Sequence, residues 1–238
     1  MQRRELLYEG KAKRVYATGE AGRYLVEFKD DATAFNGAKR GTIVQKGEVN
    51  CQVSAALFEL LTAQGVANHF VSLAGPREMV VKALKIVPVE VVIRNVVAGS
   101  MAKRFGLEEG RKLSEPLLEW YYKDDALGDP LVCSSHLYLL GAATEDQLAA
   151  MRSSALDVNA ILTGYFAGRG IELVDFKLEY GTDADGRLLL GDEISPDTCR
   201  FWDLATRDKL DKDRFRRDLG DVEEAYREVY RRVTGHEL

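Results

Sequence analysis

The stretch IELVDFKLEYGTDADGRLLLGDEISPDTCRFWD, from Ile171 to Asp203, combines two strand-like runs with an unusual density of charged side chains. Asp185-Gly186 lies between the runs and is typical of a two-residue type I′ turn, so the stretch predicts a β-hairpin. If that turn closes the hairpin, Ala184 pairs with Arg187. An ordinary core hairpin would not need so much charge, which makes this stretch the first candidate for a functional site.

The same register places Glu179 directly opposite Asp192. Like charges that face each other across two strands destabilise a sheet, and a cation between them would reverse that effect. Oxygen ligands on rigid strands suit Mg²⁺, which usually takes one or two carboxylates together with substrate phosphates. The pair therefore predicts a magnesium site, with two solvated carboxylates on an exposed hairpin as the alternative.

Composition excludes several classes of protein. The 238 residues, 46% hydrophobic and 30% charged, are enough for one large domain or two lobes. A net charge of −5 argues against nucleic acid as the main partner. No apolar run is long enough for a bilayer, and the first ten residues lack the apolar region of a signal peptide. Three scattered cysteines without a CxxC motif are typical of reduced thiols, so we expect a cytoplasmic location and no membrane partner.

Hydrophobic periodicity predicts a β-rich first part and a mixed second part. The predicted strands are Glu5–Tyr8, Arg14–Ala17, Tyr24–Lys29, Phe70–Leu73, Met79–Leu84 and Val87–Asn95. The predicted helices are Gly47–Gln64, Val97–Phe105, Leu148–Phe166 and Asp211–Thr234.

The predicted boundary between the two parts lies near Lys82–Lys85. The sequence thus predicts an α+β chain with an N-terminal lobe over residues 1–82 and a C-terminal lobe over residues 83–238. A cleft between two lobes is a usual place for a small-molecule site. Pro88 lies inside an apolar run, so we place it at the start or the edge of a strand. The polar stretch Asp30–Lys46 is left without a predicted element.

Glu9-Gly10-Lys11-Ala12-Lys13 predicts a tight turn between two strands. Glycine lets the backbone approach a ligand closely, and the two lysines can meet phosphates. A turn with two solvated lysines explains the pattern equally well, and the Walker A pattern is absent. Val80–Leu84 is an apolar run at the lobe boundary. It fits either a connector whose backbone pairs with adenine or a plain buried strand.

In Val89–Ser100 (VEVVIRNVVAGS), Glu90 and Arg94 share one face of the predicted strand, because strand faces alternate every two residues. Arg94 lies close to a glycine-serine turn that precedes a helix. An arginine, a hydroxyl and free helix N–H groups form a good pocket for a phosphate or a carboxylate. The alternative is a Glu90–Arg94 ion pair with Ser100 as the N-cap of the helix.

Two further segments, Glu119–Pro130 and Asp30–Gly37, fit either an active-site loop or a solvated turn. The patterns GxSxG, HExxH and GxGxxG are absent, and no Cys-His pairing signal is present. His136 has no second ligand at metal-binding spacing. Among enzyme classes, the residues present favour Mg²⁺-assisted phosphoryl chemistry, in which Lys, Arg and metal position and stabilise charge.

Together these segments resemble the phosphoribosylaminoimidazole-succinocarboxamide synthase (SAICAR synthetase) family over nearly the whole chain. The most diagnostic stretches are Val89–Ser100 and Val174–Gly181 (VDFKLEYG), supported by Leu7–Tyr16, Asp30–Gly37, Tyr121–Pro130 and Gly191–Asp203. The resemblance implies a reaction in which ATP, L-aspartate and carboxyaminoimidazole ribonucleotide (CAIR) give SAICAR, ADP and phosphate. By the same resemblance, the substrate carboxylate is first phosphorylated to an acyl phosphate, which the aspartate amine then attacks.

The resemblance also implies a role for each matching position. The ATP-binding positions are Gly10, Lys11, Ala12, Lys13, Val15, Lys82 and Leu84. The Mg²⁺ ligands are Glu179 and Asp192. Those that hold or orient the ribonucleotide are Arg94, Ser100, Arg200, Asp129 and Glu90. The groups near the imidazole carboxylate are Lys123, Asp175 and Lys177. Asn36 stands where some relatives carry an acid, and it is given no metal role.

The fold implied is the two-lobed SAICAR synthetase fold, with a small β-rich N-terminal lobe similar to that of protein kinases and an ATP cleft between the lobes. The family usually forms homodimers. Two other functions remain open from the residues alone. One is a small-molecule kinase that uses the same Mg²⁺-ATP site, and the other is a nucleotide-binding protein without catalysis. Dependence of ADP release on aspartate would separate the ligase from the kinase.

Overall fold

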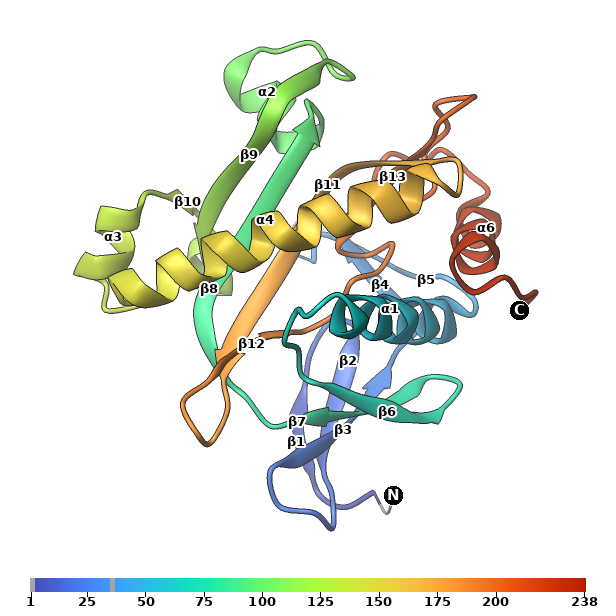
Figure 1. The fold of residues 1–238 in the computed structure, drawn as a ribbon. Coiled ribbons are helices and arrows are strands. Elements are labelled where there is room, and N and C mark those ends of the chain that lie inside the picture. The colour runs from blue at the N-terminus through green and yellow to red at the C-terminus, as the bar shows by residue number, and fades with distance from the viewer. Residues whose placement is uncertain (1–2, 35–36) are drawn as a thin grey trace.

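The computed structural model describes residues 3–34 and 37–238, and it shows an α+β chain built around two large antiparallel sheets (Figure 1). The first sheet comes from the N-terminal part of the chain, and its strand order is β1-β2-β3-β7-β6. Its strands are β1 (Leu6–Glu9), β2 (Lys13–Ala17), β3 (Arg23–Phe28), β6 (Phe70–Gly75) and β7 (Glu78–Lys82). The predicted strands of this region are confirmed to within three residues at each end.

The second sheet has the order β10-β9-β8-β11-β12, and a further strand, β13, pairs with β11. Its strands are β8 (Lys85–Val96), β9 (Lys112–Tyr122), β10 (Leu131–Val132), β11 (Ile171–Thr182), β12 (Leu188–Gly191) and β13 (Cys199–Asp203). The central neighbours β8 and β11 run antiparallel, with Asp175 opposite Arg94 and Glu179 opposite Glu90. This pairing places five of the charged residues predicted from the sequence on two adjacent strands: Glu90, Arg94, Asp175, Lys177 and Glu179.

Several helices supply residues to the main core, which also includes residues of the second sheet. The described helices are α1 (Lys46–Ala63), α2 (Gly99–Phe105), α3 (Ser134–Leu139), α4 (Glu145–Ala167), α5 (Asp213–Arg216) and α6 (Val222–Thr234), with a 3₁₀ turn at Asp125–Leu127. Figure 1 shows α4 lying across β8 and β11. Helix α1 contacts both sheets, because its Cys51 packs with the first sheet while Val53 and Leu57 belong to the larger core. In the described part of the chain, no helix is long and apolar enough to cross a membrane.

An irregularity in β11 decides which side chains reach the core. The pairing of β11 with β13 shifts between Leu173 and Asp175. Before the shift Leu173 packs into the main core, and after it Phe176 does. The core-facing residues therefore change from odd to even numbers at this bulge, as expected when one extra residue is inserted into a strand. The odd-numbered residues that follow, the charged ones, are thus turned away from the main core.

The predicted hairpin forms, but its register is wrong by one residue. Glu179 pairs with Gly191 and not with Asp192. The backbone N–H of Gly186 donates to the carbonyl of Asp183, and Gly186 has a φ of +78°, so the loop is one residue longer than the predicted type I′ turn. A three-residue hairpin loop with glycine in the left-handed region is the usual alternative to a two-residue turn.

The predicted C-terminal helix Asp211–Thr234 is also wrong, because it is interrupted. Helix α5 ends at Arg216 and α6 begins at Val222, and between them Asp218, Gly220 and Asp221 have positive φ angles. That conformation cannot continue an α-helix.

The sequence patterns also missed some elements and placed others well. The stretch Asp30–Lys46 contains a β-ribbon of β4 (Asp31–Ala34) and β5 (Lys39–Thr42). Strand β9 and helix α3 were likewise not predicted. Pro88 lies near the start of β8, as predicted. The division into lobes at residue 82 stays a prediction.

Candidate active site

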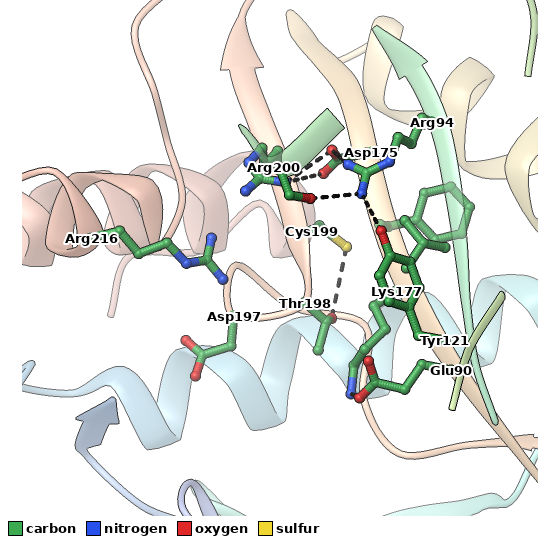
Figure 2. Close-up of a pocket in the computed structure, with 13 residues that line it drawn as sticks. Glu90, Arg94, Tyr121, Asp175, Lys177, Asp197, Thr198, Cys199, Arg200 and Arg216 are labelled. Carbon is green, nitrogen blue, oxygen red and sulfur yellow. Dashed lines mark hydrogen bonds and ion pairs between the residues drawn. The ribbon is translucent and has the colours of Figure 1, made fainter. Parts of the chain in front are cut away.

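A cavity of about 330 Å³ opens over the charged faces of β8 and β11, beside the segment that leads into β13 (Figure 2). Side chains from β8, α2, β9, β11, β13 and α5 line it, together with the turn before β13. The lining residues are Glu90, Val92, Arg94, Ser100, Tyr121, Asp175, Phe176, Lys177, Asp197, Thr198, Cys199, Arg200 and Arg216. The cavity therefore collects six of the residues predicted from the sequence: Glu90, Arg94, Ser100, Asp175, Lys177 and Arg200.

Arg94 is buried at one end of the cavity and is held by two carboxylates. Its Nε donates to Glu119 at 2.6 Å, and its Nη1 donates to Asp175 Oδ2 at 2.7 Å. Its remaining nitrogen, Nη2, donates to Ser100 Oγ at 3.2 Å and to the hydroxyl of Tyr121 at 3.1 Å. The alternative of a Glu90–Arg94 ion pair is therefore wrong, although both residues do share one face of β8.

Arg200 continues this arrangement from β13. Its Nη1 donates to both oxygens of Asp175, at 3.0 and 2.9 Å, and its Nε donates to Asp213 Oδ2 at 2.9 Å. The other oxygen of Asp213 accepts from Arg216 Nη1 at 2.7 Å. Burial alone would lower the pKa of Arg200, but Asp175 and Asp213 outweigh that effect and raise it. Arg200 therefore stays charged inside the protein.

We call this chain of alternating charges the arginine network. It consists of Arg94, Arg104, Arg200 and Arg216 with Glu119, Asp175 and Asp213, and it carries one net positive charge. Paired charges, well aligned, are the form in which buried arginines are tolerated. The excess positive charge suits an anionic ligand.

Gly99 is required beside this network. It has a φ of +54°, a conformation that L-residues with a side chain rarely adopt, and a Cβ there would collide with the guanidinium of Arg200. The next residue, Ser100, is not the N-cap of α2, because Ala98 occupies that position. Its hydroxyl accepts instead from Arg94 and from Arg104 Nη2 at 3.3 Å.

Lysines and carboxylates gather at the other end of the charged face. Lys177 Nζ is within 3.0 Å of Glu90 Oε1, makes a short contact with Glu179 and lies 3.7 Å from Asp192 Oδ2. Lys123 Nζ donates to Glu179 Oε1 at 3.0 Å. Figure 2 shows Lys177 and Glu90 apart from the group of Arg94, Asp175 and Arg200.

Lys13 reaches this group from the first sheet. It makes a short contact with Asp192 and lies 2.9 Å from Glu193 Oε1. We call the whole set the lysine cluster: Lys13, Lys123 and Lys177 with Glu90, Glu179, Asp192 and Glu193. Its carboxylates outnumber its lysines by one. Burial would lower the pKa of Lys177, but Glu179, Asp192 and Glu90 hold that pKa well above its ordinary value.

The predicted metal ligands Glu179 and Asp192 are not directly opposite each other, but both belong to the lysine cluster. Glu179 lies opposite Glu90 on β8 and not opposite Asp192. Yet Glu179 and Asp192 both approach the single ammonium of Lys177, so one small cation can reach both carboxylates. The donor set is oxygen alone, which suits Mg²⁺. Within residues 3–34 and 37–238, no three His, Cys, Asp or Glu side chains are arranged to hold a metal by themselves.

The remaining predicted site residues lie outside the cavity wall. Gly10 and Lys13 close the predicted turn, since the N–H of Gly10 donates to the carbonyl of Lys13 at 2.8 Å. Lys11 pairs with Asp125 at 2.7 Å on the surface. Ala12 accepts a backbone hydrogen bond from Lys29 at 2.8 Å.

Val15 packs beside the small core of the first sheet. Lys82 ends β7, and Leu84 lies against Gly181. Asp129 accepts from the N–H of Asp124 and shapes its loop. Asn36 lies outside the described residues.

Sequence reasoning gave no role to several residues of this site. Glu119 and Tyr121 alternate on β9 toward Arg94, so a period-two pattern would have found them had that strand been predicted. Asp213 and Arg216 lie in a segment that was read as one continuous helix, and no pattern links them to β13. Asp197 is fully paired by Lys46, Lys212 and Tyr226 at 3.0, 3.1 and 2.7 Å.

A pocket in which fixed arginines adjoin lysines and carboxylates is typical of enzymes that bind phosphorylated substrates and transfer phosphoryl groups. Comparison with known proteins narrows this class. A family model described as SAICAR synthetase matches residues 6–233. The phosphoribosylaminoimidazole-succinocarboxamide synthase of Brevibacillus brevis is 57% identical over 99% of this chain and 98% of its own length. That of Deinococcus deserti is 57% identical, with 98% and 99% covered.

Solved structures agree with the sequence relatives. A structure described as SAICAR synthetase (Type-2) in complex with ADP superposes with a TM-score of 0.95 at 49% identity, covering 98% of this chain and 99% of that one. The SAICAR synthetase of Pyrococcus horikoshii OT3 superposes with a TM-score of 0.90 at 48% identity, with 95% and 99% covered.

The chain therefore belongs to the SAICAR synthetase family, which confirms the resemblance, the two-lobed α+β fold and an ATP-dependent ligase activity. The kinase and the non-catalytic alternatives are not favoured.

Proposed function

We propose that this chain joins L-aspartate to CAIR with ATP as co-substrate and releases SAICAR, ADP and phosphate. The observation that supports this most directly is the placement of two different charged groups on one strand: one has a net positive charge, and the other combines lysines with carboxylates that can hold a cation. Asp175 of the arginine network, and Lys177 and Glu179 of the lysine cluster, alternate along β11. One end suits a fixed phosphate, and the other suits a phosphoryl group in transfer.

The arginine network is the proposed site for the ribonucleotide phosphate, with Arg94, Ser100 and Arg200 as its ligands. Arginine binds phosphate through a planar fork of donors, which holds the group in one orientation. Both oxygens of Asp175 are used by Arg94 and Arg200. We therefore assign Asp175 the role of orienting these two guanidiniums toward the ribonucleotide phosphate.

The lysine cluster is the proposed site for the ATP phosphates. The phosphates would be bound by the turn of Gly10, Lys11, Ala12 and Lys13. The adenine would lie against Val15, Lys82 and Leu84. The carboxylates of Glu179 and Asp192 would hold Mg²⁺, which supplies neutralisation of phosphate charge when it is bound. Lys13 and Lys177 now contact these carboxylates, and both ammonium groups can move to phosphate oxygens as the nucleotide binds.

The proposed chemistry has two steps. An oxygen of the CAIR carboxylate attacks the γ-phosphorus of ATP, and ADP leaves as the acyl phosphate forms. The amine of L-aspartate then attacks the acyl carbon, the C–O bond to phosphate breaks, and the amine loses a proton. Lys177 and Lys123 neutralise the negative charge of the transferred group, and Glu90 and Asp129 help to orient the substrate. Phosphorylation is needed because an amine cannot expel oxide from a carboxylate.

Three further assignments are part of this proposal. We infer lobes over residues 1–82 and 83–238, because the last strand of the first sheet ends at Lys82 and the second sheet begins at Lys85. The family resemblance supports a homodimer. A cytoplasmic location is supported by three cysteines that form no disulfide and by the biosynthetic activity of the family.

The decisive experiment measures ADP release with Mg²⁺-ATP and CAIR, with and without L-aspartate. We expect release only when all three substrates are present, with SAICAR formed in equal amount. Release without aspartate would show a kinase or an acyl phosphate that escapes to water. Absence of release with all three substrates would overturn the proposal.

A further inference from the structure

Asp213 is a carboxylate of the arginine network that holds two arginines from different elements without lining the cavity itself, as Glu119 does for Arg94 and Arg104. Its Oδ2 accepts from Arg200 Nε, and its Oδ1 accepts from Arg216 Nη1. Arg200 belongs to β13 and Arg216 to α5. Each oxygen thus serves one guanidinium, which fixes the separation of the two arginines.

A second aspartate holds the backbone around this contact. The Oδ2 of Asp211 accepts from the N–H of Phe201 at 2.9 Å, and its Oδ1 accepts from the N–H of Asp213 at 2.7 Å. The start of α5 is therefore tied to the residue that follows Arg200. Burial opposes ionisation of Asp213, but Arg200 and Arg216 lower its pKa to about 2, so it stays charged.

This arrangement solves a specific electrostatic problem. Arg200 and Arg216 both face the cavity, and two guanidiniums brought together without a counter-charge repel each other. A carboxylate placed behind them removes the repulsion and leaves their other N–H groups directed toward a ligand. Arg216 belongs to α5, and Figure 2 shows its side chain on the side of the cavity away from Arg94. Among the described residues, Asp213 is the carboxylate with which the partly exposed side chain of Arg216 forms an ion pair.

We propose that Asp213 is a positioning residue, which sets the spacing of Arg200 and Arg216 so that both guanidiniums face the anionic ribonucleotide. This inference rests on the proposed function of the cavity. Asp213 does not touch the substrate, and its effect is transmitted through the two arginines. Its loss should therefore weaken binding of the ribonucleotide and leave the ATP site unchanged.

The test compares Asp213→Asn, Asp213→Glu and the control Asp218→Asn. Asp218 lies in the same segment, is largely exposed and takes no part in the network. We expect Asp213→Asn to raise the KM for CAIR roughly 10- to 100-fold, because a neutral amide offers one acceptor oxygen where two charged ones are needed. The KM for ATP and the kcat at saturating CAIR should stay within about 3-fold of wild type, a split that loss of folding would not produce.

Two further measurements test whether Asp213 acts through the two arginines. A double-mutant cycle combines Asp213→Asn with Arg216→Gln, and the effects of the two changes on the KM for CAIR should be non-additive if Asp213 acts through Arg216. If Asp213→Asn does not fold, Asp213→Glu is the variant that tests the inference, because it keeps the negative charge and displaces both arginines. We expect this variant to show a several-fold rise in the KM for CAIR alone. An unchanged KM for CAIR in a folded variant, or an equal loss for ATP, would overturn the inference. Failure of the wild-type protein to form SAICAR would instead overturn the proposed function.

Discussion

The two ends of the charged face on β8 and β11 use opposite means to manage buried charge. In the arginine network each central arginine is fixed by two carboxylates, as Arg94 is by Glu119 and Asp175. In the lysine cluster one ammonium, that of Lys177, is shared among three carboxylates. Arginine presents a rigid fork, whereas lysine is a point charge on a flexible stem. The difference indicates that one end holds a group still and the other accepts groups that arrive, react and leave.

The largest expected effect comes from breaking the lysine cluster with Glu179→Gln. This change keeps the shape of the side chain and removes the charge that would bind the metal-nucleotide. We expect kcat to fall by a factor on the order of 10² to 10³, because several kcal/mol of charge stabilisation are lost. Far-UV circular dichroism and the melting temperature should remain close to those of wild type, since Lys177 keeps Glu90 as a partner. Near-normal turnover in this variant would contradict the metal assignment.

The next effect comes from Arg94→Lys in the arginine network. Lysine cannot satisfy Glu119 and Asp175 together with Ser100, so we expect the KM for CAIR to rise about 100-fold while the KM for ATP changes little. The free energy of unfolding should also fall by about 2–4 kcal/mol, because buried carboxylates lose a partner. Arg104→Lys, at a more exposed position of the same network, is the matched control. A loss of ATP affinity with unchanged use of CAIR would show that the pocket is assigned to the wrong substrate.

A third prediction tests whether a charged side chain is held rigidly because it is an arginine or because it is buried. Lys46 and Lys212 both contact Asp197, and Lys46 is fully buried, so here a lysine is held as rigidly as the arginines. Burial would raise the pKa of Asp197, but the two lysines hold it well below its ordinary value. An acid with a lowered pKa stabilises the fold above its unfolded pKa and loses that contribution as the pH falls below it.

We therefore expect Asp197→Asn to destabilise the protein by about 3–5 kcal/mol at pH 7. Urea unfolding should show that the difference from wild type narrows from about pH 4 downward, in the range where the unfolded carboxyl becomes protonated. The exposed Asp146→Asn on α4 is the control. A difference that stays constant down to about pH 3 would mean that Asp197 stabilises the fold by packing and not by charge.

The smallest effect concerns Cys199, which lies on the cavity wall between the two groups. Burial raises the pKa of its thiol, and burial also raises the pKa of Cys51 to about 12. Neutral thiols react slowly, so iodoacetamide should label only the exposed Cys133 in the folded protein and all three cysteines after unfolding. Labelling of native Cys199, read by mass spectrometry, would show that the wall opens to solvent.

The sequence predicted correctly which residues share one face of a strand. It did not predict the contacts between segments that are distant in the sequence. Alternation along a strand has a period of two, so the shared face of Glu90 and Arg94 follows from residue numbers alone. The hairpin register does not, because Asp185-Gly186 is compatible with loops of two or three residues. The link between Asp213 and Arg200 depends on where the chain folds back after β13. No local pattern encodes that return.

The bulge in β11 has a consequence for how substrate preference can change. Beyond it, Asp175 and Glu179 are separated by four residues of regular strand, or about 13 Å at the usual rise per residue. The strand thus fixes the distance between the residues that bind the phosphate and those at the reacting centre. A substitution on this strand changes how strongly one residue binds the substrate, but it does not change the distance between the two sites. A substrate of different length would require a strand with a residue inserted or deleted, and each such change would turn every later charge into the core.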